Sequence, residues 1–130
     1  MRLQLAINVP NLEQAIGFYE RLFGVEVNKR EPGYANFAIE EPALKLVLFE
    51  NPESSDRLNH LGFEVTSDEE VEAAAERWQA AGVTEREAGE QVCCFARQNK
   101  IEAFAPDGTM WEVYRVLEDV PAQAVTQPCC

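Results

Sequence analysis

The four cysteines of the chain form two adjacent pairs, Cys93-Cys94 inside the sequence and Cys129-Cys130 at its end. A disulfide between neighbouring cysteines would strain the intervening peptide bond away from its planar trans form. Two adjacent thiolates can instead bind one soft atom, because thiolates favour soft metals and, by the same reasoning, trivalent arsenic or antimony. The internal pair is therefore a candidate binding site for such an atom.

A second group of residues has the chemistry of metal ligands. His60 is the only histidine, and it occupies the same position as Gln4 in two similar stretches of the sequence. Glu112 lies in a strand-like stretch where alternation places it on one face with Met110 and Tyr114. Together Gln, His and Glu offer nitrogen and oxygen donors suited to a divalent first-row metal that keeps positions open for substrate, water or dioxygen.

Each of these residues also has a purely structural interpretation. A lone histidine is commonly a surface residue or a satisfied core residue, although the position that His60 shares with Gln4 favours the ligand role. Glu112 could instead lie on a solvated face, or pair with a basic residue such as Arg97 or Lys45.

The first half of the chain lacks a carboxylate equivalent to Glu112. Leu46 or a neighbouring aliphatic residue stands where that counterpart is expected, which removes a fourth ligand. Glu50 is a weaker alternative, because it lies at the end of its strand.

Four polar residues follow the internal cysteine pair: Arg97, Gln98, Asn99 and Lys100. They could form a mobile loop that gates the site, or a polar turn between two strands. Lys100 close to a thiolate would favour its ionisation and could contact a substrate there.

Length and composition limit the remaining possibilities. A chain of 130 residues with 46% hydrophobic residues can build one domain with a core but not two ordinary domains. The N-terminal stretch lacks the long apolar core of a signal peptide, and no stretch approaches a membrane span. The net charge of −12 argues against nucleic acids and anionic membranes as partners. We expect a cytoplasmic protein with reduced thiols.

An internal duplication organises the sequence. Residues 4–11 and 60–67 match in their order of polar and apolar positions, with three apolar pairs: Leu5 and Leu61, Ile7 and Phe63, Val9 and Val65. Helix-start signals follow each stretch, at Asn11 and Ser67, and amphipathic spacing then predicts helices over residues 12–23 and 71–81. Glycines suited to end these helices stand at Gly24 and Gly82.

Strand-like segments separated by turns follow each predicted helix. They lie near residues 25–30, 34–39 and 44–50 in the first half, and near 92–97, 101–105 and 110–116 in the second, with a turn at 106–108. Each half is therefore a β-α-β-β-β module. We expect a single domain over residues 1–117, with modules 1–50 and 58–117, and a mobile tail over 118–130.

One helix cannot cover both faces of a four-stranded sheet, so the two modules must pair. The expected α+β fold is an incomplete barrel of curved sheets with the helices outside. It would enclose a cleft that is a natural ligand site.

These features resemble the vicinal oxygen chelate superfamily, which includes glyoxalase I, bleomycin resistance proteins and extradiol dioxygenases. More closely, the chain resembles the arsenic-inducible carbon–arsenic lyases, a family that includes cadmium-induced-protein-like members. The segments that carry the resemblance are residues 32–39, 44–48, 59–62, 93–94 and 111–114. They combine the module pattern with an internal vicinal dithiol.

The resemblance implies an Fe(II)-dependent, dioxygen-using enzyme. It would cleave the carbon–arsenic bond of trivalent organoarsenicals, such as methylarsenite and reduced aromatic arsenicals, and release arsenite. On this resemblance Gln4, His60 and Glu112 match the metal ligands, and Cys93 and Cys94 match the catalytic, substrate-binding pair. Another divalent metal could occupy the site in vitro, and the protein would be a monomer or a homodimer.

Two other functions stay open. A non-enzymatic protein that sequesters arsenite or cadmium would need the cysteines but neither Gln4 nor dioxygen. A glyoxalase-like metalloenzyme would need the metal but not Cys93 and Cys94. The tail pair, Cys129 and Cys130, could capture arsenical or metal and pass it inward, or be an exposed dithiol.

Overall fold

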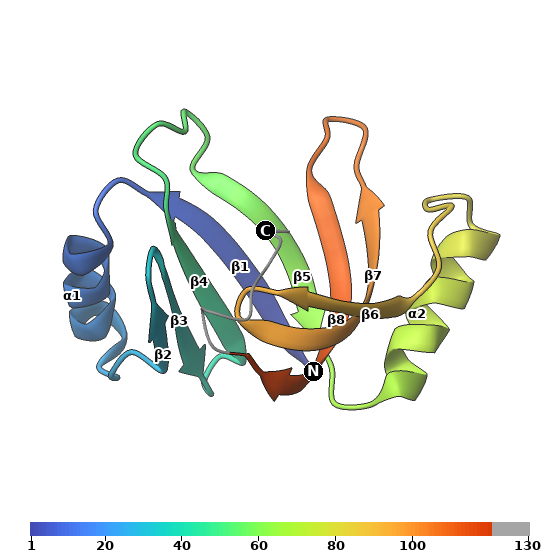
Figure 1. The fold of residues 1–130 in the computed structure, drawn as a ribbon, viewed down its shortest axis with the longest axis horizontal. Helices are drawn as coiled ribbons and strands as arrows, with labels where there is room; N and C mark the ends of the chain where they lie inside the picture. Colours follow the sequence, from blue (N-terminus) through green and yellow to red (C-terminus); the bar gives the residue numbers. More distant parts are fainter. Residues whose placement is uncertain (121–130) are drawn as a thin grey trace. The chain divides into compact units, whose positions relative to one another are not determined.

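A computed structural model describes residues 1–120, and in it the chain forms two compact units, residues 2–60 and residues 61–120 together with Met1. Each half of the chain has the expected β-α-β-β-β order of elements (Figure 1). Cys129 and Cys130 lie outside the described residues, as does most of the predicted tail. The predicted tail start at 118 is wrong, because the last strand continues through Asp119.

The first half begins with β1 (Arg2–Val9) and α1 (Leu12–Phe23), followed by β2 (Lys29–Glu31), β3 (Tyr34–Ile39) and β4 (Leu44–Glu50). The strands lie in the order β2-β3-β4-β1, and β1 pairs with β4 in parallel. Apolar side chains of α1 pack on one face of this sheet, and the buried members of this core include Leu12, Ile16, Phe37, Leu46 and Leu48. The opposite face therefore remains for other contacts.

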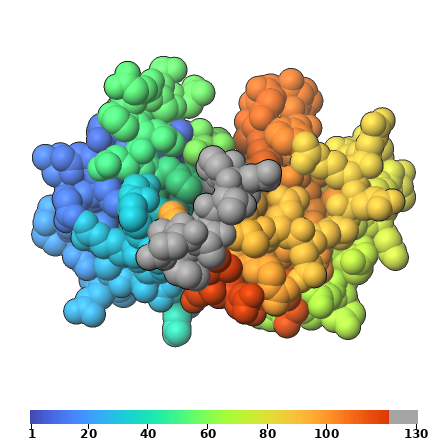
Figure 2. Space-filling model, viewed as in Figure 1, coloured from blue at the N-terminus to red at the C-terminus, as the bar shows by residue number. Residues whose placement is uncertain are grey.

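The second half contains β5 (Leu58–Glu64), α2 (Asp68–Ala80), β6 (Gly89–Cys93), β7 (Ala96–Phe104) and β8 (Met110–Asp119). Its strand order is β5-β8-β7-β6, and β5 pairs with β8 in parallel, as β1 does with β4. The helix again covers one face, through a core of Val65, Val71, Ala74, Ala75, Ile101 and Val113. The predicted turn between β7 and β8 projects at the surface as an orange lobe (Figure 2). No helix in residues 1–120 is long and apolar enough to span a membrane.

Both predicted helix-start signals are confirmed. The Asn11 Oδ1 accepts a hydrogen bond from the Gln14 backbone N–H at 3.0 Å, and the Ser67 Oγ accepts one from the Glu70 backbone N–H at 3.3 Å. Glu70 completes a capping box, because its carboxylate accepts from the backbone N–H of the N-cap residue Ser67, and its Oε2 also accepts from the Thr66 backbone N–H at 3.1 Å.

The structure corrects the predicted strands around the cysteines. Residues 92–97 are not one strand, because β6 ends at Cys93 and β7 begins at Ala96. The two residues between them, Cys94 and Phe95, have φ values of 50° and 60°, the left-handed region that type I′ hairpin turns require. The predicted loop at residues 97–100 is also wrong, because all four residues lie inside β7. Of the predicted strand at residues 25–30, only residues 29 and 30 belong to a strand, β2, which continues to Glu31.

The capping box makes stability depend on pH. Hydrogen bonds from the Thr66 backbone and then from Ser67 hold the pKa of Glu70 below its ordinary value of 4.5. A lowered folded-state pKa stabilises the fold above the ordinary pKa, and this stabilisation disappears as pH falls through the folded-state value. We expect Glu70→Gln to lower the free energy of unfolding near pH 7, with the deficit shrinking below about pH 4.5.

Urea unfolding across this pH range measures the effect. Glu69→Gln is the matched control, because it removes the same charge from the exposed neighbouring position of α2. A deficit for Glu70→Gln that is equal to that of Glu69→Gln at every pH would contradict the prediction.

Candidate functional site

Two of the predicted metal ligands, Gln4 and His60, are in direct contact. Gln4 lies on β1 and His60 on β5, and both side chains are buried. The Gln4 Nε2 donates a hydrogen bond to the His60 Nε2 over 3.1 Å. The duplication had placed them at equivalent positions, and the fold places their side chains together.

The other ring nitrogen of His60 has a partner that sequence reasoning missed. Its Nδ1 lies 2.8 Å from the Oδ1 of Asn59. An amide oxygen can only accept a hydrogen bond, so the Nδ1 carries the proton and the Nε2 of the neutral ring carries the lone pair. Metal binding through Nε2 requires this tautomer, so this structure fits His60 to the role of a metal ligand.

Glu112 belongs to a buried cluster in the second unit that centres on Lys100. The Lys100 Nζ lies 2.5 Å from the Glu112 Oε2 and 3.6 Å from the Glu102 Oε2. It also lies 3.9 Å from the Cys93 Sγ. Lys100 and Glu112 are 1% and 3% exposed, so the carboxylate is neither solvated nor far from positive charge. A buried carboxylate that holds a cation is chemically suited to bind a metal ion.

Of the two structural alternatives for Glu112, the solvated face is wrong, whereas pairing with a basic residue is confirmed, with Lys100 as that residue. The solvated face is excluded by its burial. Arg97 is engaged elsewhere, because its Nε donates to the Glu118 Oε1 at 3.0 Å and its guanidinium also pairs with Glu90. Lys100, which was expected in a loop, takes the place of Arg97 because β7 includes it.

Gly62 makes room for the Glu112 side chain. The two residues are directly paired between the parallel strands β5 and β8. A Cβ at position 62 would lie 2.7 Å from the Glu112 Cγ and 2.7 Å from its backbone oxygen, closer than real contacts allow. The Glu112 side chain and the backbone oxygen beside it thus require a glycine at position 62.

The two cysteines lie at the β6–β7 hairpin. Cys93 ends β6 and is fully buried, whereas Cys94 is the first residue of the turn. Both are disulfide-bonded in this structure, so a thiolate site requires their reduction. The Gln98 Nε2 donates to the Cys93 backbone oxygen at 3.0 Å. The Gln98 Oε1 is buried and, within residues 1–120, accepts no hydrogen bond, which leaves one acceptor beside the cysteines.

The first half has no equivalent of Glu112. Ala6 pairs with Val47 as Gly62 pairs with Glu112, so the counterpart is the buried aliphatic residue Val47. Leu46, the residue named from the sequence, is instead part of the core under α1. The prediction of an aliphatic neighbour at this position is confirmed.

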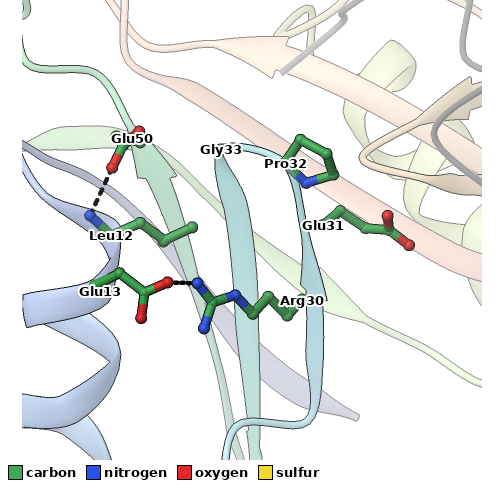
Figure 3. A pocket seen from close by; sticks show the side chains of 7 residues that line it. All are labelled: Leu12, Glu13, Arg30, Glu31, Pro32, Gly33 and Glu50. Atoms are coloured by element: carbon green, nitrogen blue, oxygen red, sulfur yellow. Dashed lines mark hydrogen bonds and ion pairs between the residues drawn. The ribbon is translucent and has the colours of Figure 1, made fainter.

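Glu50 is engaged at the start of α1 rather than beside the other predicted ligands. Its Oε2 accepts a hydrogen bond from the Leu12 backbone N–H at 2.8 Å, at the start of α1 (Figure 3). Glu50 also lines a surface cavity of about 580 Å³, with Leu12, Glu13, Arg30, Glu31, Pro32 and Gly33. Glu50 apart, none of the residues considered for the site lines this cavity, and its Arg30 is paired with Glu13.

Within residues 1–120, no three side chains of His, Cys, Asp or Glu gather as a metal-binding group. The predicted set has only one histidine and one carboxylate, and its third donor is the amide of Gln4. The structure brings Gln4 and His60 together in one unit, and Glu112, Lys100 and Cys93 together in the other.

Known proteins resemble this chain in sequence and in fold. The profile of the family described as "Glyoxalase/Bleomycin resistance protein/Dioxygenase superfamily" matches residues 3–113. "Cadmium-induced protein CadI" of Mycobacterium tuberculosis is 57% identical over 91% of this chain and 78% of its own length. "Trivalent organoarsenical cleaving enzyme" of Thermomonospora curvata is 48% identical over 99% of this chain and 87% of its own length.

A solved structure supports the fold class. A glyoxalase/bleomycin resistance protein/dioxygenase superfamily member from Vibrio splendidus aligns with a TM-score of 0.58 and 16% identity, over 89% of this chain and 98% of that chain. The expected α+β fold, with a βαβββ module in each half of the chain, is confirmed.

The packing of Gly62 predicts the outcome of a single added methyl group. Gly62→Ala should lower the free energy of unfolding by about 1–3 kcal/mol, because the Cβ meets backbone as well as the Glu112 side chain. Gly89→Ala on β6 is the control, since a Cβ there meets nothing within 4 Å. Chemical denaturation of both variants checks the prediction, and equal stabilities for the two would contradict it.

Proposed function

This chain belongs to the Glyoxalase/Bleomycin resistance protein/Dioxygenase superfamily, and we propose that it is a metal-dependent lyase that cleaves the carbon–arsenic bond of trivalent organoarsenicals. Two relatives named "Trivalent organoarsenical cleaving enzyme", 48% and 35% identical to it, support the substrate class. The proposed products are arsenite and the oxidised organic group, with dioxygen as co-substrate.

One observation carries the proposal: the ammonium group of Lys100 lies close to both the Glu112 carboxylate and the Cys93 sulfur. The Lys100 Nζ is 2.5 Å from the Glu112 carboxylate and 3.9 Å from the Cys93 sulfur. Both atoms lie close to the same nitrogen. The Glu112 oxygen, proposed to bind the metal, and the Cys93 sulfur, proposed to bind arsenic, are therefore also close to each other. Such proximity suits an enzyme that holds arsenic beside a metal, because a reaction between two groups held close together no longer depends on their diffusional encounter.

The chemistry of the three donors suits a divalent metal. His60 would bind through Nε2, Glu112 through a carboxylate oxygen and Gln4 through its amide oxygen. Fe(II) is the proposed ion, and when bound it would supply the activation of dioxygen next to the carbon–arsenic bond. Lys100 provides the positive charge that a buried Glu112 needs, and a metal ion would provide charge of the same sign to the same carboxylate.

The cysteines would bind the substrate through its arsenic. Two thiols and an organoarsenous acid with two hydroxyl groups form two arsenic–sulfur bonds and release two water molecules. After reduction, the buried ammonium of Lys100 would stabilise a thiolate on Cys93, which is the form that binds a soft centre. The turn at Cys94 matters because adjacent residues of an extended strand point to opposite faces, which would keep the two sulfurs apart.

Loss of either internal cysteine should abolish cleavage. Cys93→Ser or Cys94→Ser replaces a thiolate by a neutral hydroxyl, a poor ligand for arsenic, while the metal ligands remain. We expect no arsenite release from methylarsenite by protein that has been reduced and loaded with Fe(II) in the presence of oxygen, and nearly unchanged metal content.

The tail supplies the control for this experiment. A Cys129→Ser, Cys130→Ser double variant should keep its turnover at saturating substrate and at most capture substrate less well at low concentration. Equal collapse in the internal and tail variants would contradict the proposed division of roles. Tight binding of arsenical without release of arsenite by the native protein would favour sequestration instead.

Substitutions of the three proposed metal ligands should differ in the severity of their effects. His60→Ala should lose most bound metal and all cleavage, because it removes the only imidazole. Glu112→Gln should be nearly as severe, because it removes the one negative charge of the donor set. Gln4→Ala should be the mildest, since water can partly replace a neutral donor. Metal content and oxygen-dependent arsenite release are measured side by side.

Glu118→Gln is the control for these variants, because it neutralises an exposed carboxylate on the same strand, β8. Urea unfolding of Glu112→Gln shows whether the loss of the partner of Lys100 affects folding. Full metal content and activity in His60→Ala would refute the ligand assignment.

A further inference from the structure

His60 is held by a chain of asparagine side chains that begins at a backbone carbonyl. The Asn8 Nδ2 donates to the Asp56 carbonyl oxygen at 3.0 Å. The Asn8 Oδ1 accepts from the Asn59 Nδ2 at 2.9 Å. The Asn59 Oδ1 then lies 2.8 Å from the His60 Nδ1. All of these residues belong to the first compact unit.

The polarity of this chain can run in one direction only. A backbone carbonyl can only accept, so Asn8 must turn its NH₂ group toward Asp56. Its amide oxygen then faces Asn59, which must present its own NH₂ group. The amide oxygen of Asn59 is consequently left for His60, whose Nδ1 must donate. A fixed backbone group thus determines the proton position on a ring three hydrogen bonds away.

We propose that Asn59 and Asn8 are positioning residues that set His60 in the Nδ1–H tautomer and thereby present Nε2 to the metal. Asn59 acts directly, as the acceptor. Asn8 acts through Asn59, because it prevents the Asn59 amide from turning its NH₂ group toward the ring. This inference rests on the proposed function in one respect, namely the role of His60 as a metal ligand.

A neighbouring hydrogen bond allows the positioning role of Asn8 and Asn59 to be distinguished from simple structural support. Asn51 donates its Nδ2 to the same oxygen of Asn8, at 2.7 Å, but does not lie between Asn8 and His60. Asn51→Ala therefore removes a hydrogen bond of the same type from the same acceptor and leaves the path to His60 in place. It is the matched control for variants of Asn8 and Asn59.

The tautomer can be observed directly, because His60 is the only histidine of the chain. Long-range proton–nitrogen NMR spectra of the metal-free protein report which ring nitrogen carries the proton. We expect Nδ1–H in the native protein, in Asn51→Ala and in Asn59→Asp, whose carboxylate still accepts from Nδ1. We expect a shift toward Nε2–H in Asn59→Ala and Asn8→Leu.

Metal affinity gives a second measurement. Titration with Ni²⁺, a redox-stable divalent ion, should show binding about 10- to 100-fold weaker for Asn59→Ala than for the native protein. Asn8→Leu should be weakened in the same direction, whereas Asn51→Ala and Asn59→Asp should remain close to native. Thermal unfolding of each variant verifies that it is folded.

The inference is overturned if folded Asn59→Ala and Asn8→Leu keep both the Nδ1–H tautomer and native Ni²⁺ affinity. If neither variant folds, the native protein decides, because an Nε2–H tautomer in its metal-free form also overturns the inference. A native protein with the Nδ1–H tautomer that binds no divalent metal would support the network but sink the proposed function, so the two failures are distinguishable.

Discussion

A buried carboxylate must keep a cation beside it, and this electrostatic constraint organises the second half of the molecule. Glu112 is 3% exposed, and its charge is compensated by Lys100 on the adjacent strand. Lys100 is placed there only because β7 begins directly after a two-residue turn at the cysteines. The position of the turn therefore determines how β7 pairs with its neighbours, and this pairing determines which residues meet in the site.

Local signals explain what the sequence predicted correctly. The caps at Asn11 and Ser67, the helix period and the turn before β8 each depend on residues close in sequence, and all are present in the structure. The turn at Cys94 and Phe95 escaped prediction because neither residue is a usual turn former. The polar residues that follow were expected in a loop, whereas Gln98, Asn99 and Lys100 are buried in a strand.

In the candidate site, too, some features could be predicted from the sequence and others could not. The contact between Gln4 and His60 could be anticipated, because the duplication aligned them. The support of His60 by Asn59 and Asn8 could not, because it depends on hydrogen bonds between residues about fifty positions apart. Lys100 was recognised as a candidate near the thiols, but its ion pair with Glu112 follows from strand register, which the sequence did not determine.

The pairing of Gly62 with Glu112 also bears on how the two halves of a duplicated gene can diverge. The equivalent pair in the first half is Ala6 and Val47. A carboxylate introduced at position 47 would have to share its space with the Ala6 methyl group, whereas Glu112 faces a residue without one. The methyl group that position 62 excludes is thus present at position 6, so the two halves of the duplicated sequence are not interchangeable at this pair.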